Sequence, residues 1–144
     1  MPGEPVTRDA VVAEARSWLA VPWRHQGRSR RGIDCAGLVV LVARQLGLAD
    51  HDLAGYGRHS SGLALVDAFR AAMNTIPLPK AGPGDVLLLA DAAYPCHCGI
   101  LTELRGMPHL LHAHALRRQV IEEPYVDEWP AKARLALRFL RIAG

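Results

Sequence analysis

The chain has 144 residues and a mass of 15.7 kDa, the size of one ordinary domain, so we expect residues 1–144 to form a single domain. Half of the residues are hydrophobic and 22% are charged, a balance that excludes a largely disordered chain. The formal net charge of +3 is mild and aromatic residues make up only 6%, so no nucleic-acid partner is expected.

The cysteines and residues 1–10 indicate in which cellular compartment the chain is made. Cys35, Cys96 and Cys98 are odd in number and form no disulfide framework, which predicts reduced thiols in a chain made in the cytoplasm. Residues 1–10 lack the apolar run of a signal peptide, and no stretch approaches the roughly 18 apolar residues of a membrane span. We therefore expect no membrane span, and delivery by other means if the protein acts outside the cytoplasm.

The first half of the chain has the apolar spacing of helices. Thr7 is placed to cap a helix over about 7–19, because apolar residues recur there every three or four positions. Residues 34–47 are apolar nearly all round and end in glycine, which predicts a buried helix capped by Asp34. A polar loop over 49–61 precedes a third expected helix, from Ser61 to about residue 73.

The second half of the chain changes to short apolar or alternating runs after a linker rich in proline and glycine at 77–84. Turns are expected at 106–108 and 115–116. The strands are expected at residues 85–90, 97–102, 110–114, 117–122 and 135–142. Helices followed by strands predict an α+β domain with a mostly antiparallel sheet of five or six strands.

Cys35 is the first candidate for chemistry, because it lies in the first turn of the predicted helix after Asp34. The positive end of the helix dipole favours the thiolate, and the thiolate is the nucleophilic form of cysteine. Unpaired N–H groups of that turn could hold the oxyanion of an acyl-transfer intermediate. The alternative is a small buried hydrophobic residue, which is what most free cysteines are.

A cysteine nucleophile needs a base, and His97 and His112 are the best candidates. Side chains alternate along a strand, so His97 shares a face with Gly99 and Leu101, while Cys98 takes the opposite face. If the two histidine strands pair, His97 and His112 become neighbours, with the second ring orienting the first and stabilising its cation.

A metal site is the alternative use of these residues. Cys96-His97-Cys98 and His112-Ala113-His114 have the ligand types of a zinc site, but the spacing differs from the common structural sites. A site of Cys35, His97 and His112 remains geometrically possible, whereas His114 is expected to be a surface or groove residue.

Four motifs follow one another along the chain: Val21-Pro22-Trp23-Arg24 with Gly32-Ile33-Asp34-Cys35-Ala36-Gly37-Leu38-Val39, Pro83-Gly84-Asp85, His97-Cys98-Gly99-Ile100 and Leu110-Leu111-His112-Ala113. Together they resemble the NlpC-type papain-like cysteine peptidases, which cleave bacterial cell walls. The resemblance spans about residues 15–122. It departs from the family pattern at Ala36, where the family has serine, and at Trp23, where it has tyrosine.

The resemblance implies a role for each matching residue. Cys35 matches the nucleophile, His97 the general base and His112 the third polar residue of the site. Trp23, Arg24 and Asp34 flank the nucleophile and are the expected substrate-binding residues. The implied reaction is hydrolysis of amide bonds in the stem peptides of peptidoglycan, with no cofactor and no metal.

The Asp-Cys-Ala-Gly sequence, a Tyr56-Gly57-Arg58 segment and the lack of a secretion signal resemble most the branch found in phage tails and gene-transfer agents. That likeness implies a wall hydrolase carried by a virion or a secretion apparatus. Two other functions stay open: an acyltransferase or amidase that uses the same Cys–His pair, and a non-catalytic tail-assembly protein.

Overall fold

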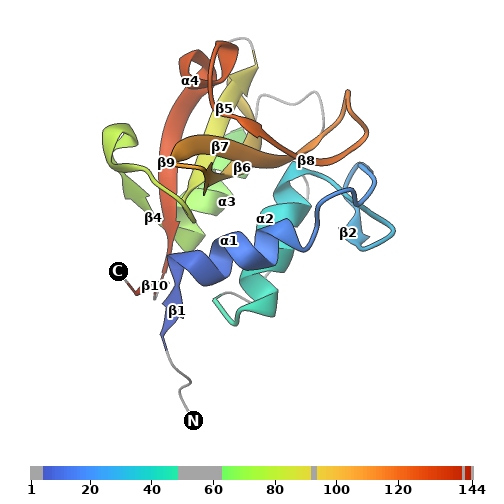
Figure 1. Ribbon diagram of the computed structural model, residues 1–144, viewed down its shortest axis with the longest axis horizontal. Coiled ribbons are helices and arrows are strands. Elements are labelled where there is room, and N and C mark those ends of the chain that lie inside the picture. The colour runs from blue at the N-terminus through green and yellow to red at the C-terminus, as the bar shows by residue number, and fades with distance from the viewer. Residues whose placement is uncertain (1–4, 49–62, 92–93, 141, 144) are drawn as a thin grey trace.

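The body of the structure is an antiparallel sheet of six strands with helices packed against it (Figure 1). This computed structural model describes residues 5–48, 63–91, 94–140 and 142–143. The elements are, in chain order, β1 (Val6–Thr7), α1 (Arg8–Arg16), β2 (Arg28–Ser29), β3 (Gly32–Ile33), α2 (Cys35–Gln45), α3 (Leu63–Ala72), β4 (Met73–Ile76), a 3-10 turn (Leu78–Lys80), β5 (Val86–Asp91), β6 (Tyr94–Leu104), β7 (Met107–His114), β8 (Gln119–Pro124), α4 (Glu128–Lys132), β9 (Ala133–Phe139) and β10 (Ile142–Ala143).

The strand order in the main sheet is β4-β9-β5-β6-β7-β8, and every neighbouring pair is antiparallel. Strands β5 to β8 therefore follow one another as hairpins, and β9 returns to pair with β5. Two smaller pairs lie outside this sheet: β1 with β10, and β2 with β3. The predicted α+β class with a mostly antiparallel sheet is confirmed.

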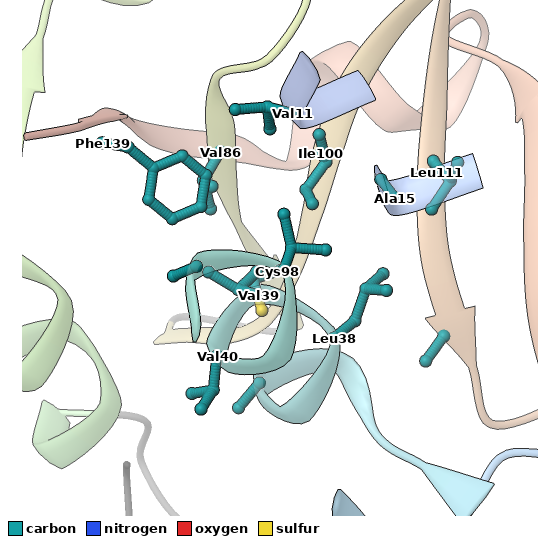
Figure 2. Close-up of a cluster of buried hydrophobic side chains, with 14 of the residues drawn as sticks. Val11, Ala15, Leu38, Val39, Val40, Val86, Cys98, Ile100, Leu111 and Phe139 are labelled. Carbon is teal, nitrogen blue, oxygen red and sulfur yellow. The ribbon is translucent and has the colours of Figure 1, made fainter. Parts of the chain in front are cut away.

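Helices α1 and α2 pack against the sheet over β6 and β7, and this contact forms the main core. Leu38 and Val39 of α2 lie beside Cys98 and Ile100 of β6 (Figure 2). Every residue from Ala36 to Val40 is buried, as expected for a helix that is apolar nearly all round. This packing fixes the start of α2 against the sheet.

Two of the helix ends that the sequence marks are formed as predicted. The Thr7 hydroxyl accepts a hydrogen bond from the Ala10 N–H (3.1 Å) and caps α1. Gly47 has a φ of +70°, and the Leu48 N–H reaches back to the Ala43 carbonyl (2.8 Å), the pattern of a glycine C-cap after α2. Position 61, the expected cap of the third helix, and the loop at 49–61 lie outside the described residues.

The Pro83-Gly84-Asp85 segment joins α1 to the sheet. Gly84 has a φ of +89°, and a Cβ there would lie 3.0 Å from the Arg8 backbone oxygen, so only glycine suits this position. The fully buried carboxylate of Asp85 accepts hydrogen bonds from Arg8 (2.9 Å) and from Arg138 of β9 (2.8 and 2.9 Å). This charged cluster ties α1, β5 and β9 together.

Several boundaries differ from the prediction. The turn expected at 106–108 is formed by Arg105 and Gly106, both with positive φ, and β7 already begins at Met107. The turn expected at 115–116 extends to residue 118, so β8 begins two residues later than predicted. The C-terminal run splits into β9 and β10, because β10 leaves the main sheet to pair with β1.

The sequence did not predict β1, β2, β3, β4, the 3-10 turn or α4. They are only two to five residues long. β1 and β4 are stabilised by partners distant in sequence, whereas β2 and β3 form a short local hairpin. The described part of the chain contains no helix long and apolar enough to cross a membrane.

Candidate active site

The site begins at the first turn of α2. Cys35 is the first helical residue and is half-buried, while Asp34 is buried and caps the helix by accepting the Gly37 N–H (2.8 Å). The second carboxylate oxygen of Asp34 accepts the Gln26 N–H (2.7 Å), and Arg28 donates to the first (3.1 Å). Asp34 thus fixes the helix start and the preceding loop in one place.

Close packing explains why residue 37, two positions after the nucleophile, is a glycine. A Cβ at Gly37 would lie 2.5 Å from the Gly27 carbonyl oxygen and 2.9 Å from Ile33, so the helix approaches the loop more closely than any side chain permits. The loop is correspondingly tight, because a Cβ at Gly27 would lie 2.3 Å from the Gly32 oxygen. The Asp-Cys-Ala-Gly sequence is therefore a packing requirement as well as a chemical one.

Two histidines and a carboxylate form a chain of hydrogen bonds across β6, β7 and β8. Nε2 of His97 lies 2.7 Å from Nδ1 of His112, and Nε2 of His112 lies 2.8 Å from an Oε atom of Glu123. His112 is fully buried, whereas the Glu123 side chain is 28% exposed. His97 and His112 are neighbours, as predicted, whereas Glu123 was not predicted to belong to the site.

Gly99 leaves space for these hydrogen-bonded side chains, because it lies on the same face of β6 as His97. A Cβ at Gly99 would lie 2.7 Å from a Leu110 methyl carbon and 3.1 Å from the His112 Cβ. We expect Gly99→Ala to displace His112 from His97, to destabilise the fold by about 1–3 kcal/mol and to slow catalysis about tenfold. Urea unfolding and steady-state rates measure both effects, and unchanged rates in a folded variant would contradict this role of Gly99.

The Cys35 thiol lies within hydrogen-bonding reach of both His97 and Cys98. The contact with Cys98 is the largest influence and lowers the pKa of Cys35, while burial raises it. The hydrogen bond and positive charge of His97 lower the pKa further, so the result lies well below the ordinary value of a thiol. The site therefore stabilises the thiolate form of Cys35 relative to an ordinary cysteine.

Cys98 supports the thiolate from the core side of β6. It is fully buried, and the contact with Cys35 together with burial raises the pKa of Cys98 well above its ordinary value. Cys98 therefore keeps its proton and can donate it in a hydrogen bond to the Cys35 sulfur. The predicted alternation is present, because Cys98 and His97 approach the nucleophile from opposite faces of β6. The side chain of Cys96 lies outside the described residues.

The buried position of His112 decides its charge. Burial lowers the pKa of His112 to about 2, and the positive charges of His97 and His114 act in the same direction. His112 is therefore neutral at neutral pH. A positive charge formed during catalysis resides on His97, next to the thiolate.

Trp129 of α4 closes the outer side of the histidines. Its ring lies 5.0 Å from the His112 ring, 6.0 Å from the His114 ring and 6.2 Å from the His97 ring, measured between centroids. Trp129 was not among the residues predicted for the site, because α4 was not expected. His114, assigned to the surface or groove, is half-buried and belongs to this aromatic cluster.

The three expected substrate-binding residues occupy different positions. Trp23 is half-buried and its backbone bridges to Ile33, which places it beside the nucleophile segment. Arg24 is exposed, and its side chain passes over Gly32. The described contacts of Asp34 are structural, so substrate contact by these three residues stays a prediction.

In the loop over residues 22–32, Arg28 and Arg30 are held by internal contacts. Arg28 bonds to Asp34 and to the Gly27 carbonyl, and Arg30 stacks on the Trp18 ring at 3.6 Å while donating to the Ser17 carbonyl (2.6 Å).

Within the described ranges, no group of three or more His, Cys, Asp or Glu side chains is arranged so that it could hold a metal ion.

A cysteine at the start of a buried helix, paired with a histidine on an antiparallel sheet, defines a papain-like cysteine peptidase. The model of the NlpC/P60 family matches residues 20–135 of the chain. The chain therefore belongs to the NlpC/P60 family, and the predicted resemblance is confirmed.

Solved structures share this fold. The NlpC/p60 domain of the peptidoglycan hydrolase SagA is 24% identical with a TM-score of 0.67, over 93% of this chain and 100% of that one. An NlpC/P60 family protein from Bacillus cereus ATCC 10987 is 18% identical with a TM-score of 0.72, over 95% of this chain but only 41% of that one. An N-acetylmuramoyl-L-alanine amidase from Bacteroides uniformis ATCC 8492 is 12% identical with a TM-score of 0.65, over 92% and 98%. No curated protein sequence matches the chain significantly.

Proposed function

We propose that this protein is an endopeptidase that hydrolyses amide bonds in the stem peptides of peptidoglycan. The observation that carries the proposal is the Cys35 thiol at the start of α2, in contact with His97, which in turn lies 2.7 Å from His112. Membership of the NlpC/P60 family, and the names of two of its structural neighbours as wall hydrolases, support the choice of substrate.

The geometry supports the following reaction. His97 takes the Cys35 proton, and the thiolate attacks the amide carbonyl to form a tetrahedral intermediate. Asp34 already occupies the N–H of Gly37 through its carboxylate and that of Leu38 through its carbonyl, so we assign the oxyanion to the Cys35 N–H. The His97 cation protonates the leaving amine, and water then hydrolyses the thioester.

Digestion of purified sacculi tests this proposal. The expected products carry new amine and carboxyl ends inside the stem peptide, identified by mass, and protein blocked with iodoacetamide should release none. Release of intact stem peptides from the sugar chain would instead indicate the amidase activity for which the Bacteroides neighbour is named. Fragments joined to an added amine such as hydroxylamine, in excess over hydrolysis, would indicate an acyltransferase.

Delivery to the wall by a virion or a secretion apparatus is a further part of the proposal. It rests on the sequence likeness to the phage-tail and gene-transfer-agent branch. Its test is the fractionation of particles released by the producing cell, in which the protein should copurify with tail structures. Recovery only in the soluble cell fraction would contradict it.

A further inference from the structure

We propose that Glu123 is a positioning residue, which fixes where the protons lie on both histidines and so leaves one nitrogen of His97 free to act as the base. This inference rests on the thiol chemistry of the proposed function, but not on the identity of its substrate. It follows from two distances, 2.7 Å between His97 and His112 and 2.8 Å between His112 and Glu123.

The hydrogen atoms on the two histidines can be placed by starting from Glu123, at one end of the hydrogen-bonded series. An ionised glutamate has only acceptors, so the hydrogen atom between Glu123 and His112 belongs to Nε2 of His112. A neutral imidazole carries a single N–H, so Nδ1 of His112 is then an acceptor. The hydrogen bond at 2.7 Å must therefore be donated by Nε2 of His97.

The consequence appears at the nucleophile. With its Nε2 donating to His112, a neutral His97 has an unprotonated Nδ1, the nitrogen that can accept the Cys35 proton. After the transfer, the sulfur is negative, His97 carries both N–H groups, and the hydrogen bond to His112 is retained. The proton stops at His97, while the Glu123 charge stabilises the new cation through the neutral ring of His112.

The opposite assignment shows why the carboxylate matters. Without a fixed acceptor at its Nε2, His112 can carry its hydrogen on Nδ1 and donate it to His97. His97 then accepts at Nε2 and holds its own hydrogen on Nδ1, facing the thiol, where it cannot act as a base. In triads of serine peptidases, replacing the acceptor that selects the tautomer also lowers the rate.

The neighbouring residue on β8 provides a matched control. Glu122 faces the other side of the sheet, where it accepts hydrogen bonds from Arg16 (2.9 Å) and from the Thr102 hydroxyl (2.6 Å). Its side chain is only 8% exposed, compared with 28% for Glu123. Adjacent carboxylates on one strand therefore have separate roles: Glu122 ties α1 to the sheet, and Glu123 orders the histidines.

The experiment compares Glu123→Gln, Glu123→Ala and Glu122→Gln with the wild type. The first readout is the rate of alkylation of Cys35 by iodoacetamide at neutral pH, located by mass spectrometry, because this reaction needs the thiolate but no wall substrate. The second is the ¹⁵N NMR spectrum of the histidine rings, in which protonated and unprotonated ring nitrogens are distinguished. Unfolding in urea controls for stability.

We expect both Glu123 variants to alkylate about tenfold more slowly and to lose the single Nε2–H form of His112, with little change in stability. Glu122→Gln should be less stable and otherwise unchanged. Wild-type alkylation and an unchanged His112 spectrum in Glu123→Ala would overturn the proposal, as would equal slowing in Glu122→Gln. A protein that passes these tests but leaves sacculi intact would refute the proposed substrate alone.

Discussion

Replacing Cys35 by alanine is expected to abolish turnover, and replacing His97 by alanine to lower kcat/KM about a thousandfold. The first change removes the atom that forms the thioester. The second removes both the base that activates the thiol and the acid that protonates the leaving amine. Hydrolysis rates on sacculi or on a released muropeptide measure both effects.

Alkylation of Cys35 separates the two functions of His97, because it reports the effect of His97 on the thiolate alone. Cys98 contributes the largest lowering of the Cys35 pKa, and His97 adds a hydrogen bond and a positive charge. Loss of His97 therefore raises the Cys35 pKa only in part, and the onset of alkylation moves to higher pH. In His97→Ala we expect alkylation at neutral pH to fall by about tenfold, far less than turnover, because alkylation needs no general acid.

His109→Ala is the control for this comparison. His109 lies on β7 like His112, but its ring bonds to the carbonyl of Met107 at the start of the strand (3.0 Å), so its loss should leave both rates unchanged. More than a tenth of wild-type turnover in His97→Ala would contradict the role of His97. An alkylation profile in that variant that matched the wild type would show that His97 does not influence the thiolate.

The central part of the site could be predicted because its geometry is local. The cap at Asp34 places Cys35 in a first helical turn, and strand alternation places His97 and Cys98 on opposite faces of β6. One hairpin then brings His112 beside His97. Each of these steps needs only the period of a helix or strand and a short connection.

Glu123 and Trp129 could not be predicted in the same way. Glu123 pairs with Leu110, and only this register brings its side chain diagonally next to His112. A shift of one residue along β8 would exchange the faces of Glu122 and Glu123, and alternation alone does not fix which of them meets the histidines. Trp129 depends on α4, which is five residues long and whose position depends on its contact with β5.

Asp85→Ala is expected to lower the free energy of unfolding by about 3 kcal/mol. The change leaves the guanidinium groups of Arg8 and Arg138 without their shared buried acceptor, and the Gly82 N–H (2.9 Å) loses the same partner. The two arginine side chains are 24% and 28% exposed, so water compensates in part, and the loss lies at the lower end of the range for broken buried ion pairs. Urea unfolding of the purified variant measures the change.

Asp67→Ala provides the comparison, because Asp67 is exposed on α3 and its loss should change stability by no more than about 0.5 kcal/mol. A loss below about 1 kcal/mol in Asp85→Ala would contradict the structural role of the carboxylate. The variant should still alkylate at Cys35 at the wild-type rate while folded, because the Asp85 cluster supports the sheet and α1, whereas the thiolate depends on His97 and Cys98. The Pro83-Gly84-Asp85 segment then serves the fold, and the Asp-Cys-Ala-Gly segment serves both the fold and the chemistry.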